Sequence, residues 1–257
     1  MSTQLKIMSF NMRNDHAADG ENAFLLRRER ILACLDEARA DVIGFQEITV
    51  TMRAWLVENL HDYYTVGGAR NANYTGEASL IAFRKDEFDL LSCDTLMLSS
   101  TPRLFGSRYD GSDQSGCPRV YTRVCLKHHD IAEPFYVYNV HTDHRGSVSR
   151  MLASNQLLQD LTSHGAHFFM TGDFNATPDA PEIAMITACR SRAIVDATAE
   201  LGGTFHGFGA LEVPTKIDYI FTDVAIKTIS AACVDDTPAE GEPYISDHYP
   251  IYIVAEM

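Results

Sequence analysis

An acid and an amide stand two residues apart directly after an apolar run, in the stretch 167–178 with the sequence HFFMTGDFNATP. The apolar run predicts a buried strand that ends near Gly172. Asp173 and Asn175 then point the same way if the backbone stays extended, because side chains alternate along a strand. Such a pair can hold an oxyanion, a water or a metal-bound phosphate. The competing interpretation is a loop capped by Asp and Asn, which are common turn residues.

The same arrangement, a polar residue at the end of an apolar run, recurs elsewhere in the chain. Four predicted strands end at such a residue: Asn11, Glu47, His141 and Asp173. Two more begin directly after one: Asp218, and the pair Asp247 and His248. If the last two strands run antiparallel to the first four, all of these side chains gather at one edge of the sheets. Random placement of polar residues would not favour such convergence.

The gathered side chains meet the requirements of one reaction. The carboxylates of Glu47 and Asp247 and the carbonyl of Asn11 are hard oxygen ligands, which suit Mg²⁺ or Mn²⁺. His248 can serve as a base whose tautomer is set by a carboxylate, and Asp218 is the candidate for that acid. The attack of water on phosphorus needs a metal, a base and a second histidine that stabilises an anion. For each residue taken alone, a structural role is the competing interpretation.

Further candidates surround His141, the second histidine. Glu77 comes just before a predicted strand at 79–83 and can pair with His141 as an orienting acid. Arg119 has two open interpretations, a phosphate ligand and one half of a structural ion pair. His144 follows His141 in a turn, where it either binds substrate or is simply exposed to solvent.

The elements that must position these residues alternate in type along the chain. Strands are predicted at 5–10, 41–47, 79–83, 88–93, 120–127, 135–140, 167–171, 217–222 and 251–254, and helices at 21–40, 51–60, 147–161 and 181–189. Ser147 is the expected N-cap of the third helix. The stretch 99–118, with two prolines and three glycines, predicts a long surface loop, and 231–244 is expected to be irregular. Because no repeat, low-complexity tract or linker divides the chain, we expect a single domain over residues 1–257.

The charge of the chain limits its partners. The 257 residues carry 35 acids against 21 bases, a formal net charge of −14. A generic nucleic-acid binder is usually basic, because phosphate contacts dominate its affinity. The acidity therefore disfavours extended DNA or RNA as a substrate. A small phosphorylated substrate stays compatible, because a bound divalent metal inverts the local field.

The remaining composition points to an ordinary globular protein. Hydrophobic residues make up 46% of the chain, enough for a full core. The six cysteines form no CxxC pair, which favours reduced thiols in the cytoplasm. The first residues have no signal-peptide pattern, and no run reaches the ~20 apolar residues of a membrane helix, so no membrane insertion is expected. No obligate protein partner is evident.

Six short motifs together resemble the endonuclease/exonuclease/phosphatase superfamily, which has the deoxyribonuclease I-like fold. They occur in the order seen in that superfamily: SFN at 9–11, GFQE at 44–47, YNVH at 138–141, TGDFN at 171–175, IDYIF at 217–221 and SDH at 246–248. The resemblance spans about residues 5–255. The combination of GDFN with the terminal SDH is specific, whereas any single piece is weak.

The resemblance implies an α+β fold, a four-layer α/β/β/α sandwich with two mixed sheets packed face to face and helices outside. It also implies divalent-metal-dependent hydrolysis of a phosphoester, with Mg²⁺ or Mn²⁺ as the cofactor. Carried over by position, Glu47 is the main metal ligand, with Asn11 and Asp247 nearby. Asp173 orients or activates the attacking water, and Asn175 holds a phosphate oxygen.

The resemblance also assigns the histidines. His248, paired with Asp218, is a base or a stabiliser of the transition state. His141 takes the position of a phosphate-binding residue, and Glu77 is its orienting partner.

Some residues depart from the nuclease branches of that superfamily. Arg13 stands where abasic-site nucleases tend to have an acid, which puts a second metal ligand there in doubt. The segments GTFHG at 203–207 and PRVY at 118–121 resemble a bacterial subgroup with poorly defined substrates. We expect His206 near the mouth of the pocket, where it would bind substrate and determine specificity.

Three hypotheses follow. The first is a metal-dependent phosphoesterase that hydrolyses a small phosphodiester or phosphomonoester by in-line attack of water. The second is a DNA or RNA nuclease with the same site and a different surface. The third is a non-catalytic binding module on the same fold, and the chemically intact catalytic positions speak against it.

Overall fold

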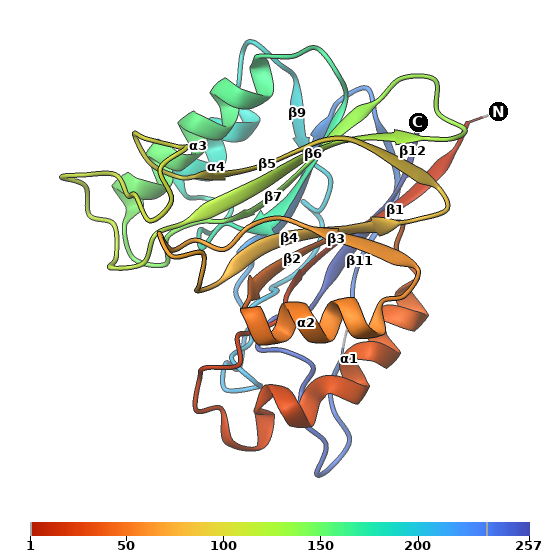
Figure 1. The fold of residues 1–257 in the computed structure, drawn as a ribbon, viewed down its shortest axis with the longest axis vertical. Helices are drawn as coiled ribbons and strands as arrows, with labels where there is room; N and C mark the ends of the chain where they lie inside the picture. Colours follow the sequence, from red (N-terminus) through yellow and green to blue (C-terminus); the bar gives the residue numbers. More distant parts are fainter. Residues whose placement is uncertain (1, 235) are drawn as a thin grey trace.

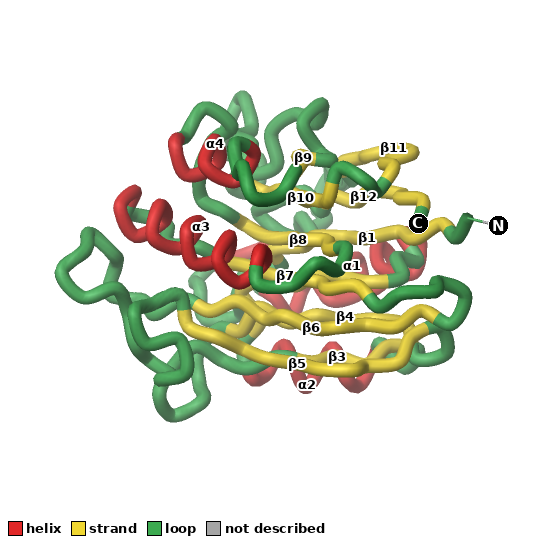
Figure 2. The backbone as a smooth tube through the Cα atoms, turned by 90° about the horizontal axis from the view of Figure 1, so that it is seen from above, coloured by secondary structure: helices red, strands yellow, loops and turns green. Residues whose placement is uncertain are grey.

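Two mixed six-stranded sheets form the centre of the molecule in the computed structural model, which describes residues 2–234 and 236–257. The strands of the first sheet follow in the order β11 (Lys227–Cys233), β12 (Ile251–Glu256), β1 (Gln4–Asn11), β2 (Val42–Ile48), β4 (Ala78–Arg84) and β3 (Tyr63–Val66). Those of the second follow in the order β5 (Phe88–Met97), β6 (Val120–His128), β7 (Phe135–His141), β8 (Phe168–Asp173), β10 (Asp218–Asp223) and β9 (Ile194–Asp196). The two ends of the chain lie side by side, where Thr3 N donates to Met257 O at 3.0 Å (Figure 2).

Helices cover the outer face of each sheet (Figure 1). The 3₁₀ turn η1 (Gly20–Asn22) leads into α1 (Phe24–Ala38), which lies with α2 (Val50–Asn59) against the first sheet. The second sheet is covered by α3 (Ser147–Thr162) and α4 (Pro181–Thr187). This arrangement confirms the predicted four-layer α/β/β/α sandwich. Within the described residues, every helix is too short or too polar to cross a membrane.

Three apolar cores separate the four layers, because side chains alternate between the two faces of each strand. In β1, Leu5 and Ile7 enter the core between the sheets, whereas Met8 and Phe10 face the core under α1 and α2. The third core joins α3 and α4 to the second sheet around Leu157. Strands buried on both faces have nearly continuous apolar sequences, which is why most of them were predictable.

A polar seam crosses the core between the sheets, below the edge where the strands end. Asn139 of β7 donates from Nδ2 to the backbone carbonyls of Phe45 at 2.7 Å and Leu80 at 2.8 Å in the first sheet. Gln46 donates from Nε2 to Asn139 Oδ1 at 2.6 Å. The β2–β4 pairing is irregular between Phe45 and Ile48, and such an irregular ladder leaves backbone groups for side chains to satisfy. The seam therefore fixes the position of one sheet against the other beneath the strand ends.

Three strands lack a sequence signal. β3, β9 and β11 are short or carry mostly half-exposed side chains, so they show neither an apolar run nor a clear alternation. The stretch 231–244, predicted to be irregular, begins with the last residues of β11.

The stretch 99–118 is irregular, as predicted, and it is tied to the second sheet and its helix (Figure 1). Asp113 of this loop accepts from the backbone N–H groups of Val148 at 3.0 Å and Ser149 at 2.9 Å, and so caps α3. The prediction of Ser147 as N-cap is wrong, because Gly146 holds that position and the capping carboxylate comes from the loop.

Substituting Gly44 by Ala should strain the packing of the two sheets. A Cβ at Gly44 would overlap Thr171 Oγ1 and lie 2.7 Å from Asn139 Oδ1. We expect a loss of about 1–3 kcal/mol in the free energy of unfolding, measured by urea denaturation, because overpacked cores must shift. Gly165→Ala is the matched control, since nothing lies within 4 Å of its Cβ, and it should change stability by under about 0.5 kcal/mol. Equal stability of the two variants would contradict the role of this contact.

Candidate active site

The polar strand ends converge at one edge of the sandwich. β1 runs parallel to β2 and β7 runs parallel to β8, so each pair of strands ends on the same side. β12 is antiparallel to β1, and β10 is antiparallel to β8 with Asp218 opposite Asp173. The edges of the two sheets meet where Asn11 Nδ2 donates to Asp173 Oδ2 at 2.9 Å. The strand directions assumed from the sequence are therefore confirmed.

A pocket of about 390 Å³ opens at this edge. It is lined by nine of the residues selected from the sequence: Glu47, Glu77, Arg119, His141, His144, Asp173, Asn175, Asp247 and His248. Asn11 and Asp218 lie directly behind this lining and bond to it. Hollows of about 490 and 840 Å³ lie elsewhere on the described surface, but no histidine lines them. The chemistry of its lining, and not its size, distinguishes the pocket.

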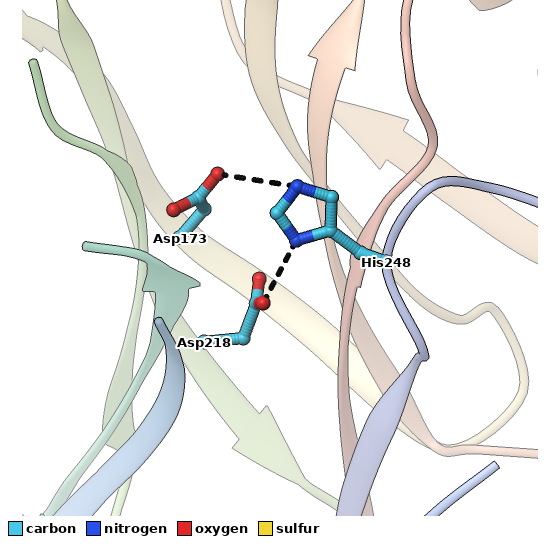
Figure 3. Close-up of side chains that lie close together, drawn as sticks. All are labelled: Asp173, Asp218 and His248. Atoms are coloured by element: carbon cyan, nitrogen blue, oxygen red, sulfur yellow. Dashed lines mark hydrogen bonds and ion pairs between the residues drawn. The ribbon is translucent and has the colours of Figure 1, made fainter. Parts of the chain in front are cut away.

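Asp173, Asp218 and His248 form a buried trio at the base of the pocket (Figure 3). His248 Nδ1 donates to Asp218 Oδ2 at 2.8 Å, and His248 Nε2 lies 3.8 Å from Asp173 Oδ2. Thr204 Oγ1 also donates to Asp218 Oδ2, at 2.5 Å. The ring is therefore held from one nitrogen while the other faces Asp173.

Electrostatics keep His248 protonated. Burial alone would lower the pKa of His248, but the charge and hydrogen bond of Asp218, together with the charge of Asp173, raise it to about 10. Burial and the neighbouring charge of Asp218 raise the pKa of Asp173. At neutral pH the trio thus holds an imidazolium beside an unusually basic carboxylate.

Amide groups hold the carboxylate of Glu47 in place. Asn14 donates to Glu47 Oε2 from its backbone N at 3.0 Å and from Nδ2 at 2.7 Å. Asn11 donates from Nδ2 to Glu47 Oε1 at 3.2 Å. The oxygens of Asn11, expected near a cation, are turned elsewhere: Oδ1 accepts from Arg13 N at 3.0 Å, and the backbone carbonyl accepts from Ser246 Oγ at 2.6 Å. Asn11 therefore reaches the site through its nitrogen.

Three of the six described non-glycine residues with positive φ line the pocket. Arg13, Glu47 and Asn175 have φ values of 53°, 63° and 47°, in the left-handed region that non-glycine residues rarely adopt. All three follow or end strands and line the pocket. Such strain persists only where the surrounding structure imposes it, and it is typical of functional sites.

Two sets of side chains offer ligand atoms for a cation. Asp173, Asp218 and His248 bring ligand atoms within 4.8 Å of one another, but the imidazolium of His248 is bonded to Asp218 and repels a cation. Glu47 and Asp247 face the same pocket, and burial with the charge of Glu47 raises the pKa of Asp247 against the opposing effect of His248. A divalent cation bound to both carboxylates relieves this repulsion, so Glu47 and Asp247 fit a metal better than the trio does.

Arg119 joins the two histidines on the other side of the pocket. Its Nη1 donates to His141 Nε2 at 2.9 Å and its Nη2 donates to His144 Nδ1 at 2.8 Å, since a guanidinium can only donate. Its Nε lies 3.8 Å from the carboxylate of Asp143, so Arg119 also has the structural ion pair that was one of its two interpretations. Burial, followed by the charge of Arg119, holds the pKa of His141 well below its ordinary value. His141 is therefore neutral at physiological pH.

Glu77 does not orient His141. Within the described part of the chain, its carboxylate pairs with Arg70, at 2.5 Å to Nη1 and 3.1 Å to Nη2. The predicted pairing of Glu77 with His141 is wrong, because Arg70 binds the carboxylate of Glu77 instead. From the sequence, this arginine was not considered as a partner.

His206 is not at the pocket mouth. Its side chain is 2% exposed and stacks on Tyr249, with ring centroids 4.1 Å apart. Its backbone N donates to the Asp247 carbonyl at 2.9 Å, so it supports the site from behind. Asn175 lies in the pocket as expected, with Nδ2 donating to Thr142 O at 3.3 Å.

Arg27 of α1 is a buried support that sequence reasoning missed. Its guanidinium is fully buried and donates to four backbone carbonyls: Met12 at 2.8 Å, Arg13 at 2.9 Å, Asn22 at 2.7 Å and Ile245 at 2.6 Å. These bonds tie the end of β1 to the segment that precedes Asp247 and His248. The available sequence signal was an arginine on the apolar face of the predicted helix at 21–40. A buried cation needs hydrogen-bond acceptors of its own, so such an arginine indicates a structural role.

The sandwich and the cluster of carboxylates, asparagines and histidines at its edge define a hydrolase of the deoxyribonuclease I-like fold. The model of the Endonuclease/Exonuclease/phosphatase family matches residues 8–248, so the chain belongs to that family, whose members hydrolyse phosphoester bonds. No curated protein matches the sequence.

Solved structures agree with this assignment. An endonuclease/exonuclease/phosphatase from Bacteroides vulgatus is 27% identical with a TM-score of 0.90, over 99% of each chain. A mannosyl-6-phosphatase from Bacteroides thetaiotaomicron is 23% identical with a TM-score of 0.88, over 98% of this chain and 99% of its own. TDP2 of D. rerio, complexed with a single-stranded DNA product, is 17% identical with a TM-score of 0.79, over 99% of this chain and 100% of its own. The last two show the shared fold alone.

Replacing Arg27 by Met should leave four buried carbonyls without donors. We expect a loss on the order of 3 kcal/mol in the free energy of unfolding, since each unsatisfied buried acceptor costs about 1–3 kcal/mol. Arg27→Lys should lose less, because an ammonium keeps the charge and up to three donors. Arg28→Met, on the same helix, removes ring contacts with Phe24 and Trp55 and should cost about 1 kcal/mol or less. Equal losses at positions 27 and 28 would contradict the role of Arg27.

Replacing Asp218 by Asn should remove the charge that keeps His248 protonated. We expect the pKa of His248 to fall clearly below about 10, because burial is then opposed only by the charges of Asp173 and Asp247. In the native protein the raised pKa stabilises the fold fully below pH 6.5, and this contribution is lost as pH rises towards 10. Nitrogen NMR of the imidazole measures the pKa, and urea unfolding at pH 7 and pH 10 measures the stability. Asp86→Asn, at an exposed position, is the control and should leave the pKa of His248 unchanged. An unchanged pKa of His248 in Asp218→Asn would show that Asp218 does not act on His248.

Proposed function

We propose that the protein is a divalent-metal-dependent phosphoesterase that hydrolyses small phosphomonoesters or phosphodiesters by in-line attack of water. The observation that carries this proposal is the meeting of two carboxylates, Glu47 and Asp247, with the Asp173–Asp218–His248 trio in one small pocket. Each part alone has structural explanations, but their convergence from both sheets matches the needs of phosphoester hydrolysis.

Glu47 and Asp247 would hold Mg²⁺ or Mn²⁺, since both offer hard oxygen atoms to the pocket. When bound, the cation polarises the phosphoryl group and offsets its charge. Asn14 and Asn11 position Glu47 for this task through three hydrogen bonds.

The chain's own residues account for the proton transfer. Asp173 has a raised pKa and lies at the pocket surface, so its carboxylate orients a water and accepts its proton as it attacks phosphorus. The His248 imidazolium stabilises the negative charge that develops on the phosphoryl oxygens. Asp218 keeps His248 charged and oriented. Asn175 is placed to hold a phosphoryl oxygen.

One of the similar solved structures supports a small substrate. The mannosyl-6-phosphatase of the same fold acts on a small phosphomonoester by its name. A DNA or RNA nuclease remains the alternative, and the TDP2 structure holds a DNA product on this fold. The net charge of −14 disfavours a long polyanion on this chain. The six free cysteines suit a reducing compartment such as the cytoplasm.

Purified protein with Mg²⁺ or Mn²⁺ should hydrolyse a chromogenic phosphoester, and EDTA should stop the reaction. Glu47→Gln should shift the metal titration to higher concentration, because one carboxylate ligand is lost. His248→Ala should lower kcat by roughly 10²–10⁴, because the group that stabilises the developing negative charge is lost. Glu58→Gln, on the exposed face of α2, is the control and should change neither quantity. Inactivity over a broad panel of phosphoesters with both metals would refute the proposed function.

A further inference from the structure

His144 stands at the rim of the pocket. Of the described residues that line the pocket, His144 alone is exposed, whereas Asp173, Asp247 and His248 are buried. The phosphorus of an ester must lie against these buried residues for a water held there to attack it. The alcohol part of the ester then extends towards the opening. His144 therefore lies where the alcohol part of a substrate passes.

The backbone of His144 is held in a fixed turn. The Oδ1 atom of Asp143 accepts from the backbone N of Arg145 at 3.0 Å and from that of Gly146 at 2.8 Å. The same buried carboxylate accepts from both the backbone N and the Oγ of Ser115, in the neighbouring loop. The turn that carries His144 is thus closed on itself and fastened to the loop beside it.

The ring of His144 is held as well. Arg119 donates from Nη2 to His144 Nδ1 at 2.8 Å, while its Nη1 donates to His141 Nε2 at 2.9 Å. The guanidinium group is itself fixed, because Arg119 is 5% exposed and its Nε lies 3.8 Å from the carboxylate of Asp143. An exposed side chain whose backbone and ring are both fixed is preorganised to bind a ligand.

The two bonds from Arg119 decide which nitrogen of each imidazole carries the proton. A guanidinium only donates, so the nitrogen that it meets must offer a lone pair. Partial burial and the charge of Arg119 lower the pKa of His144, so its ring is neutral like that of His141. The proton then resides on Nε2 in His144 and on Nδ1 in His141. His144 presents an N–H on the side of its ring away from Arg119, whereas His141 Nε2, 3.5 Å from Asp173, has no proton to donate.

We propose that His144 contacts the alcohol part of the substrate by donating its Nε2–H to an oxygen atom, and that Arg119 is the positioning residue that fixes this tautomer. This inference rests on the proposed function and narrows its substrate class to phosphoesters whose alcohol carries a further oxygen, such as a second hydroxyl group. His141 makes no such donation from Nε2 and instead holds Arg119 in place.

Nitrogen NMR of the native protein with Mg²⁺ tests the tautomers directly. At neutral pH we expect a proton on Nδ1 of His141 and on Nε2 of His144, with the signals assigned by replacing each histidine in turn. Arg119→Met should release both rings, and His141 should gain a proton on Nε2 because Asp173 lies near as an acceptor. Arg145→Met, at an exposed position next to His144, is the control and should leave both tautomers unchanged. A proton on Nε2 of His141 or on Nδ1 of His144 in the native protein would overturn the inference.

Substitutions at His144 separate the roles of its two nitrogens in catalysis. The amide nitrogen of Gln can take the place of Nε2, and that of Asn the place of Nδ1, so only His144→Gln keeps the donor. For glycerol phosphate, kcat/KM should fall by about 3–10-fold in His144→Asn and His144→Phe, the range for one lost hydrogen bond, and by under about 2-fold in His144→Gln. Propyl phosphate has the same carbon chain without further hydroxyl groups, so each variant should stay within about 2-fold of the native protein on it.

Both esters are measured as the monoester and as the methyl diester, so the comparison holds whichever ester class the protein prefers. The native protein should prefer the glycerol ester. Equal losses on glycerol and propyl esters in His144→Phe, or no loss on either, would overturn the inference and leave the proposed function standing. Hydrolysis of chromogenic phosphoesters without hydrolysis of any glycerol ester would do the same. Failure to hydrolyse any phosphoester would instead overturn the proposed function, and this inference with it.

Discussion

The amide of Asn11 is the contact on which the site depends, because it joins the two halves of the sandwich at their common edge. From β1 in the first sheet, its Nδ2 donates to Glu47 at 3.2 Å and to Asp173 of the second sheet at 2.9 Å. The amide nitrogen of Asn11 thereby sets the distance between Glu47, whose carboxylate suits a metal, and Asp173, whose carboxylate suits a water. The seam of Gln46 and Asn139 below it keeps the sheets from sliding, so the spacing is rigid.

Charge at the pocket is balanced locally, although the chain as a whole is strongly acidic. The imidazolium of His248 lies between Asp218 and Asp173, and Arg13 lies 3.6 Å from Asp247. Buried charges are tolerated only when paired in this way. Under the proposed function, the formal net charge of −14 disfavours long polyanions, whereas a bound divalent cation would let the pocket admit a small anion.

Hydrogen bonds hold the backbone and the neighbouring loop in place around this site. Arg13, Glu47 and Asn175 hold left-handed backbone conformations, and Arg27 secures the first of them through its carbonyl. The loop at 99–118 is fastened as well, since Ser115 N and Oγ both donate to the buried carboxylate of Asp143 beside Arg119. Groups that are preorganised in this manner need little rearrangement when charge develops in a transition state.

The sequence by itself determined the residues that carry the chemistry and the strands that end at them, because buried strands leave apolar runs and Asp173, Asp218 and His248 stand at their ends. It also determined the family, through motifs spread over the chain. The sequence also predicted the pair of His248 with Asp218, but only the tertiary structure decided the partners of the other residues. Glu77 bonds to Arg70 and not to His141, Asn11 turns its nitrogen to the site, and His206 lies behind Asp247. Hydrogen bonds between residues distant in sequence depend on competition among all the donors that the fold brings together, and no local pattern contains that competition.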